Sequence, residues 1–228
     1  MKLFKLNRRM FLFLMLLIIA LSVFVSKNLR ASKKSFLNDW SSGYSELITA
    51  KNNPRSEEFS QALSDAAVQR TKAHVKYNGA YVEISYPGGD VPEEMGVCTD
   101  VLIRAYRKIG IDLQKNVHED MEANFDLYPN LWGLGGTDTN IDHRRVPNLM
   151  LFFSRKGEVL PITKNPKDYL PGDIVAWNTF GLTHIGLVVN VPSPENSRYM
   201  IVHNFGNGPE MVDFLFSHKI IGHFRYEG

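Results

Sequence analysis

The stretch EEMGVCTDVLIRAY, residues 93–106, contains Cys98, the single cysteine of this 228-residue chain. Apolar residues after the cysteine recur at helical spacing and Gly110 follows them, so the stretch predicts an amphipathic helix that begins at Cys98. A lone thiol forms no disulfide within its own chain. It is therefore a small buried hydrophobe, an intermolecular linker or a reactive group.

The segments before this helix predict two more helices and one strand. A helix is expected around residues 36–50, and a second one after Ser56, whose side chain is typical of a helix cap. A strand over residues 80–85 and the turn YPGGD, residues 86–90, follow.

The segments after the helix change from helical to β-rich. Residues 117–127 are expected to be helical and GLGGTDTNID, residues 133–142, to form a loop, with Asp142 as a candidate cap for a helix through RRVPNLMLFFSR, residues 144–155. From Glu158 onward, turns separate short runs that predict antiparallel strands: EVLPI, DIVAW, HIGLVVNV, RYMIVHN, PEMVDFL and IIGHFRY. Helices first and a β-meander last predict an α+β fold.

Residues 1–34 carry eight of the 26 basic residues and no acid, and they include the apolar run Met10–Val25. This run is shorter than the roughly 20 residues of a spanning helix and longer than the roughly 7–15 residues of a signal-peptide core. We expect a signal anchor with a basic flank, and an extracytoplasmic, periplasmic domain tethered to the inner membrane; a cleaved signal peptide is the alternative. The other 18 basic and 24 acidic residues make a poor nucleic-acid binder, because phosphate affinity is mainly cationic.

A cysteine nucleophile reacts as its thiolate, so its pKa, about 8.5 in a free thiol, has to be lowered. A helix N-terminus and a neighbouring imidazole both act in this direction. His184 and His203 lie in consecutive predicted strands, where antiparallel pairing would place them side by side as base and orienting group. Taken alone, each is more readily explained as structural. The chain has no metal-ligand spacing and no phosphate-binding glycine loop, so no metal and no cofactor are expected.

The order Tyr-x-x-Gly-Gly, Cys, Gly-Asp-Ile-Val, His-Ile-Gly-Leu-Val and Val-His resembles the papain-like cell-wall cysteine peptidases of the NlpC type. Three stretches resemble hallmarks of a bacterial family catalogued as domain of unknown function 1287. They are SYPGGDVPEEMGVCTDV, TNIDHRRVPNL and LPGDIVAWN. The resemblance covers roughly residues 60–228 and implies a papain-like fold, with the cysteine-bearing helix packed on the β-meander.

The resemblance also implies a Cys-His-His triad. Cys98 would be the nucleophile, His184 the general base within roughly 3–4 Å of the sulfur, and His203 the group that orients it. Tyr86 and a backbone N–H at Cys98 would hold the oxyanion. Asp100 departs from the Cys-Ser-Gly pattern of the wider family, and it either disfavours the thiolate or caps the helix and points away.

The expected domains are the signal anchor and flank over residues 1–34, a helical linker over 35–58, and the hydrolase domain over 59–228 with an insertion at about 112–157. The insertion supplies candidate substrate-binding residues, because paired arginines bind carboxylates. The alternative is that these charges form local ion pairs that order the loop. The candidates are Trp132, His143, Arg144 and Arg145.

Together these features predict an extracytoplasmic cysteine hydrolase that cleaves an amide bond in peptidoglycan stem peptides. One alternative is a catalytically inactive muropeptide-binding or scaffolding protein of the same fold. Another is an acyltransferase that uses the same Cys-His chemistry.

Overall fold

The computed structural model describes residues 26–40, 56–195 and 197–228, and it confirms the α+β prediction. The α-helices are α2 (Glu57–Arg70), α3 (Cys98–Lys108), α4 (Leu113–Ala123) and α5 (Val146–Lys156), and residues 26–40 form a further helix. The 3₁₀ helices are η1 (Phe125–Leu127), η2 (Asp142–Arg144) and η3 (Pro166–Asp168). The strands are β1 (Lys76–Tyr77), β2 (Met95–Gly96), β3 (Glu158–Val159), β4 (Ile174–Thr179), β5 (Leu182–Pro192), β6 (Tyr199–Asn204), β7 (Pro209–Val212) and β8 (Lys219–Arg225).

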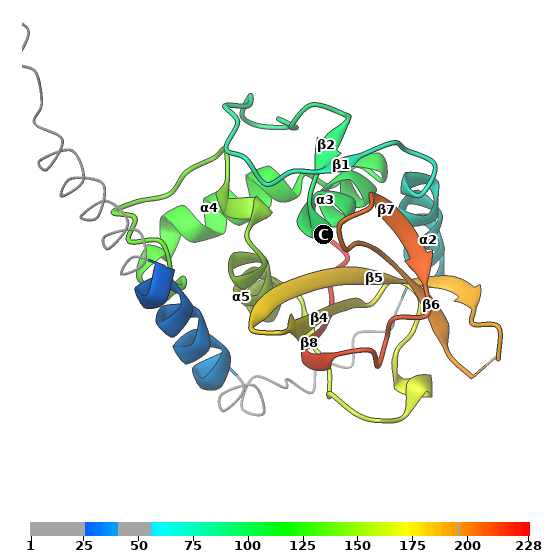
Figure 1. Ribbon diagram of the computed structural model, residues 1–228. Coiled ribbons are helices and arrows are strands. Elements are labelled where there is room, and N and C mark those ends of the chain that lie inside the picture. The colour runs from blue at the N-terminus through cyan, green and yellow to red at the C-terminus, as the bar shows by residue number, and fades with distance from the viewer. Residues whose placement is uncertain (1–25, 41–55, 196) are drawn as a thin grey trace, which may run out of the picture.

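Strands β3 to β8 form one antiparallel sheet in the order β3-β8-β4-β5-β6-β7 (Figure 1). Each strand coincides with one of the six predicted β-rich runs. Strands β4 to β7 pair with their sequence neighbours, as a meander requires, and β8 returns to pair with β4 on its other side. The alternation of side chains along each strand then divides the residues between two faces of the sheet.

The two faces of the sheet have different neighbours. On one face, Ile185 and Leu187 of β5 pack into the main hydrophobic core, which includes Cys98 and side chains of α2, α3 and α5. On the other face, Trp177 and Val188 belong to a second core that contains residues of the segment between β7 and β8. The helix that begins at Cys98 therefore lies against the centre of the sheet, as predicted.

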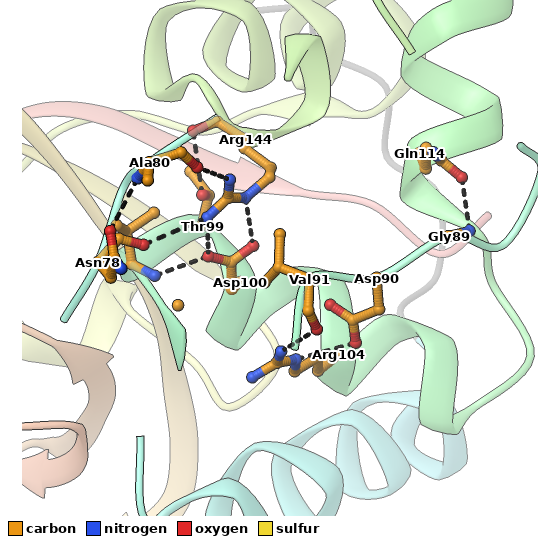
Figure 2. A network of polar contacts seen from close by, with 12 residues as sticks. Asn78, Ala80, Gly89, Asp90, Val91, Thr99, Asp100, Arg104, Gln114 and Arg144 are labelled. Carbon is orange, nitrogen blue, oxygen red and sulfur yellow. Dashed lines mark hydrogen bonds and ion pairs between the residues drawn. The ribbon is translucent and has the colours of Figure 1, made fainter. Parts of the chain in front are cut away.

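The first turn of α3 is fixed by its own side chains. Asp100 accepts a hydrogen bond from the backbone N–H of Val97 at 2.6 Å, which satisfies one of the unpaired donors of the helix N-terminus. Arg104 donates to the carboxylate of Asp90 at 2.9 Å and also to the backbone carbonyls of Val91, Pro92 and Glu93 (Figure 2). These bonds attach residues 90–93 to the helix and so set the position of Cys98.

The predicted strand over residues 80–85 is wrong. The backbone groups of this segment form hydrogen bonds with side chains instead. The Ile84 N–H donates to the Asn140 side chain at 2.8 Å, and the Ala80 carbonyl accepts from Arg144 at 3.2 Å. β-propensity is overridden here because these side chains bond the backbone groups that a neighbouring strand would pair with. A short parallel pairing of β1 with β2 lies just before it and brings Tyr77 opposite Gly96.

Gln114 at the start of α4 joins three separate segments. Its fully buried side chain accepts from the N–H of Gly89 at 2.8 Å (Figure 2). It also donates to the carbonyls of Ser85 and Thr139, at 2.9 and 3.0 Å. One amide therefore ties the turn that contains Ser85 and Gly89, and the loop at Thr139, to α4.

Two predicted helices differ in their boundaries. The expected helix over 117–127 begins earlier, at Leu113, because Asp112 caps it, and it continues as η1 after Ala123. Asp142 does not cap α5; it accepts from the backbone N–H of Asp138 and pairs with Arg145. Pro147 lies in the first turn of α5, where a missing N–H costs least.

The helix expected around residues 36–50 begins earlier, and residues 26–40 are helical; the rest of that prediction lies outside the described residues. Leu37 is buried against the domain, and the indole N–H of Trp40 donates to the Ile221 carbonyl of β8 at 2.6 Å. The predicted anchor, Met10–Val25, also lies outside the described residues. Within the described residues, none of the helices combines the length and the apolar character needed to cross a membrane.

Candidate active site

Cys98 lies at the floor of a cavity of about 420 Å³ and is 4% exposed. One wall comes from the segment around Tyr77, and another from the end of the insertion, with Trp132 and residues 144–147. The β4–β5 hairpin contributes Gly181 and Thr183, and the helix over residues 26–40 contributes Lys33, Phe36 and Leu37. The thiol is thus in the hydrophobic core but reaches the cavity.

The environment of Cys98 raises its pKa to about 11, which corrects the expectation of a lowered value. Burial is the largest cause, because it disfavours the charged thiolate, and the carboxylate of Asp100 acts in the same direction. Hydrogen bonds from the backbone N–H groups of Ile185, Thr99 and Cys98 itself oppose this shift but do not cancel it. The resting thiol is therefore neutral, despite its place at a helix N-terminus.

Tyr77 lies beside the sulfur. Burial and the neighbouring thiol of Cys98 raise the pKa of Tyr77 to about 12. The parallel pairing of β1 with β2 places it there. Tyr86, the predicted oxyanion residue, does not line the cavity; it is 41% exposed and packs edge-on against His118, with the ring centroids 4.9 Å apart. No sequence signal separates Tyr77 from the other tyrosines, because its position depends on this long-range pairing.

His184 and His203 lie side by side, as the strand pairing predicted. Nε2 of His184 is 2.7 Å from Nδ1 of His203, and both residues are buried. Gly186 lies beside the pair, where an added Cβ would come within 3.1 Å of the Cβ of His203. Burial lowers the pKa of His184 to about 3 and that of His203 to about 4, so both rings are neutral near pH 7. The rings of Trp177, Phe205 and Phe214 surround the pair.

Residues on both sides of His184 lie at the thiol. The Ile185 N–H points at the sulfur, and Thr183 lines the cavity together with Cys98. Among the hydrogen bonds of the described residues, none joins the sulfur to either imidazole, so the predicted 3–4 Å contact is not formed as a hydrogen bond here. His184 and His203 pack against Trp177 and Phe214 on the other face of the sheet, whereas Ile185 packs with Cys98, so the structure does not bring the predicted triad together.

Asp100 and Arg144 form a buried ion pair next to Cys98 (Figure 2). Arg144 donates to both carboxylate oxygens, at 2.9 and 3.0 Å, and also to the carbonyls of Ala80 and Asn78. Asp100 thus caps the helix and disfavours the thiolate at the same time. These bonds occupy the guanidinium of Arg144, so for this residue the structure supports the alternative of a local ion pair that orders the loop.

The other candidate substrate-binding residues divide into two groups. His143 is buried and does not line the cavity, and burial lowers its pKa to about 3. Arg145 and Trp132 both line the cavity, with the guanidinium 4.1 Å above the indole ring. Arg145 also pairs with Asp142 at 3.3 Å. Lys33, which the sequence did not single out, lines the same cavity.

The walls of the cavity are cationic. Lys33, Arg144 and Arg145 line it, and the described lining residues include no aspartate or glutamate. Arg144 is neutralised by Asp100 and Arg145 is partly neutralised by Asp142, so the charge available to a ligand comes mainly from Lys33. An anionic group would be attracted into such a cavity, where low-dielectric walls strengthen the field.

The sequence of residues 64–226 matches the family described as Domain of unknown function (DUF1287). "Uncharacterized protein YijF" from Escherichia coli (strain K12) is 50% identical over 166 residues, which cover 72% of this chain and 80% of that protein. A solved structure, NlpC1 from Trichomonas vaginalis, is similar with a TM-score of 0.41 and 15% identity, over 76% of this chain and 46% of that one. The chain thus spans less than half the length of that structure. The family match extends over most of the chain and includes Cys98, His184 and His203, so the protein belongs to the DUF1287 family.

Proposed function

We propose that the protein is a cysteine hydrolase that cleaves an amide bond in peptidoglycan stem peptides. The observation that carries the proposal is the surroundings of Cys98. Its sulfur faces a cavity, Tyr77 lies beside it, nearby backbone N–H groups favour the thiolate, and a buried histidine pair lies on the other face of the adjoining strands. These are the groups that a thiol nucleophile requires.

In the proposed mechanism the sulfur of Cys98 attacks the substrate carbonyl while His184 accepts the thiol proton. Because Cys98 and the ring of His184 lie on opposite faces of the sheet, this step requires the start of β5 to rearrange when substrate binds. His203 stabilises the imidazolium through Nε2 of His184. The carbonyl oxygen becomes an oxyanion held by the Tyr77 hydroxyl and a backbone N–H. The C–N bond then breaks, the amine leaves with the proton from His184, and water hydrolyses the thioester to release the acid.

The pKa values require proton transfer to accompany attack. Moving a proton from a thiol of pKa about 11 to an imidazole of pKa about 3 costs on the order of 10 kcal/mol at 1.36 kcal/mol per pKa unit. A turnover near 10 s⁻¹ allows a barrier of roughly 16 kcal/mol. A preformed ion pair is thus not needed, but bound substrate has to stabilise the charges that develop.

The cationic cavity supports an anionic peptide as substrate. Stem peptides carry free carboxylates, and Lys33 and Arg145 offer hydrogen-bond donors for them. Lys33 belongs to the helix over residues 26–40 and Arg145 to the insertion, so the two donors come from different parts of the cavity wall. The ring of Trp132 beneath Arg145 keeps the guanidinium in place.

The second candidate is a muropeptide-binding protein without catalysis, and the raised pKa of Cys98 favours it. The experiment that separates the two incubates the purified protein with muropeptides and follows new amine termini by mass spectrometry. We expect cleavage by the wild type and none by Cys98→Ala, with Tyr86→Phe as a control that cleaves normally. Cleavage that survives Cys98→Ala contradicts the mechanism, and binding without cleavage by the wild type supports the second candidate.

We further propose that the domain is extracytoplasmic and tethered through Met10–Val25. Support comes from the basic, acid-free composition of residues 1–34 around this apolar run. A reporter enzyme that is active only outside the cytoplasm, fused after Gly228, tests this placement. An inactive fusion of normal abundance contradicts it.

A further inference from the structure

The helix over residues 26–40 and the β4–β5 hairpin enclose a second, wider hollow of about 820 Å³. Figure 1 shows this helix beside the end of β5 at the hairpin. Arg30, Lys33 and Lys34 line the hollow, and the described lining residues include no acid. Its apolar lining comes from Leu29 and Leu37 of the helix and from Phe180 and Leu182 of the hairpin.

Phe180 at the hairpin tip is not explained by folding. Its side chain is 92% exposed, and its φ of 57° lies in the left-handed region. Two-residue hairpin turns place asparagine or glycine at such positions, because a bulky residue there is strained. The chain therefore keeps a large aromatic ring in water at a position where a small polar residue would stabilise the fold.

Phe180 is part of an apolar ridge. Leu182 is 58% exposed and Phe205 is 44% exposed. The ring of His218 connects the two aromatic residues, with centroids 5.1 Å from Phe180 and 5.9 Å from Phe205. Contiguous exposed apolar side chains of this kind mark interaction surfaces.

The neighbouring helix presents a basic face. Lys27, Arg30 and Lys34 are exposed and follow helical spacing, so they share one side, and residues 26–40 contain four basic residues against one acidic residue. A cluster of cations next to exposed aromatic and aliphatic side chains is the pattern of a surface that lies in a membrane interface. The cations attract anionic headgroups, and the apolar side chains enter the acyl boundary.

We infer that the β4–β5 tip and the basic face of the helix over residues 26–40 dock on an anionic phospholipid bilayer, with the ring of Phe180 among the acyl chains. Two observations favour a bilayer over a protein partner. The charge of the helix complements anionic lipid, and the helix directly follows the apolar run Met10–Val25 in the sequence. The cavity of Cys98 shares Lys33, Leu37 and Gly181 with the hollow, so docking places that cavity beside the membrane surface.

The test uses the full chain reconstituted in vesicles of phosphatidylcholine and phosphatidylglycerol, with or without bromine on the acyl chains. Phe180→Trp adds one indole at the tip, and Ile162→Trp, at a 38% exposed position in the loop after β3, is the matched control. Wild-type fluorescence gives the background of Trp40, Trp132 and Trp177. We expect brominated lipid to quench the added signal of Phe180→Trp and to leave that of Ile162→Trp unchanged.

Other outcomes overturn the inference. An indole at position 180 that aqueous iodide quenches and brominated lipid does not is exposed to water and does not contact the bilayer. An indole shielded from both quenchers is covered by protein, either a second copy or a partner. Attachment through Met10–Val25 alone predicts equal results for the two variants, so this comparison does not depend on that segment.

Charge reversal tests the electrostatic part separately. In Phe180→Trp that also carries Lys27→Glu, Arg30→Glu and Lys34→Glu, we expect lipid quenching to be lost, and vesicles of phosphatidylcholine alone should have the same effect. Undiminished quenching in either case contradicts docking on anionic lipid. None of these measurements requires turnover at Cys98, so they stand whether or not the proposed hydrolase activity is found.

Discussion

Replacing Arg144 by methionine removes one partner of a fully desolvated ion pair while keeping a side chain of similar length. The side chains of Arg144 and Asp100 are 1% and 4% exposed and share two hydrogen bonds of 2.9 and 3.0 Å. Removal of one partner leaves an unpaired carboxylate in the core, which costs about 3–5 kcal/mol. In a protein of this size, 1 kcal/mol lowers Tm by about 2–4 °C, so a fall of roughly 6–20 °C is expected.

The assay is thermal unfolding followed by circular dichroism at neutral pH, with Arg198→Met as the matched control. Arg198 also binds both oxygens of a carboxylate, that of Asp213, but each side chain is 27% exposed. A partly solvated pair of this kind contributes about 1 kcal/mol or less. The two arginine variants thus remove ion pairs of similar bidentate geometry that differ in how far the side chains are buried.

The double variant Asp100→Asn with Arg144→Met completes the cycle. It removes both charges, so it should be more stable than Arg144→Met alone, although the cap on Val97 is weakened by about 1 kcal/mol. Equal Tm values for Arg144→Met and Arg198→Met would refute the structural role of Arg144. If Arg144→Met left Tm unchanged but abolished muropeptide binding, the result would indicate that Arg144 binds substrate, as the sequence predicted.

Three further outcomes follow from the site. The alkylation rate of Cys98 by iodoacetamide should keep rising as pH approaches about 11, and a plateau near neutral pH would reveal a thiolate–imidazolium pair instead. Tyr77→Phe should lower muropeptide cleavage roughly 100-fold by removing an oxyanion donor, whereas Tyr86→Phe should not, and equal rates would exclude Tyr77. Stability in urea should fall as pH drops from about 6.5 toward 4, by up to about 1.4 kcal/mol per pH unit for each of His184 and His203. The unfolded chain binds these protons and the folded chain does not, so a flat profile would contradict the buried pair.

The sequence was most informative where a local pattern and the tertiary structure agree. The β-rich runs after Glu158 all contain strands, and the helical spacing after Cys98 became α3, because each pattern matches the surface that the two cores bury. The pairing of His184 with His203 followed from consecutive antiparallel strands. These features depend on periodicity, which a single sequence displays directly.

The rest depended on contacts between distant segments. Residues 80–85 have strand-like composition, but side chains from the insertion take their hydrogen bonds. Tyr77 lies beside the sulfur because β1 pairs with β2 over two residues, and no sequence motif predicts this pairing. The pKa of Cys98 was expected to fall because a helix terminus is visible in the sequence, whereas the desolvation that raises it depends on the assembled core.

The three hydrogen bonds of Gln114 have a mechanical consequence. They couple the turn near Ser85 to the loop at Thr139, so these two segments and α4 are held together as one unit. The helix over residues 26–40 is held separately, through Leu37 and the bond from Trp40 to β8. The wall of the Cys98 cavity that comes from this helix and the segments tied by Gln114 are therefore held by separate sets of contacts.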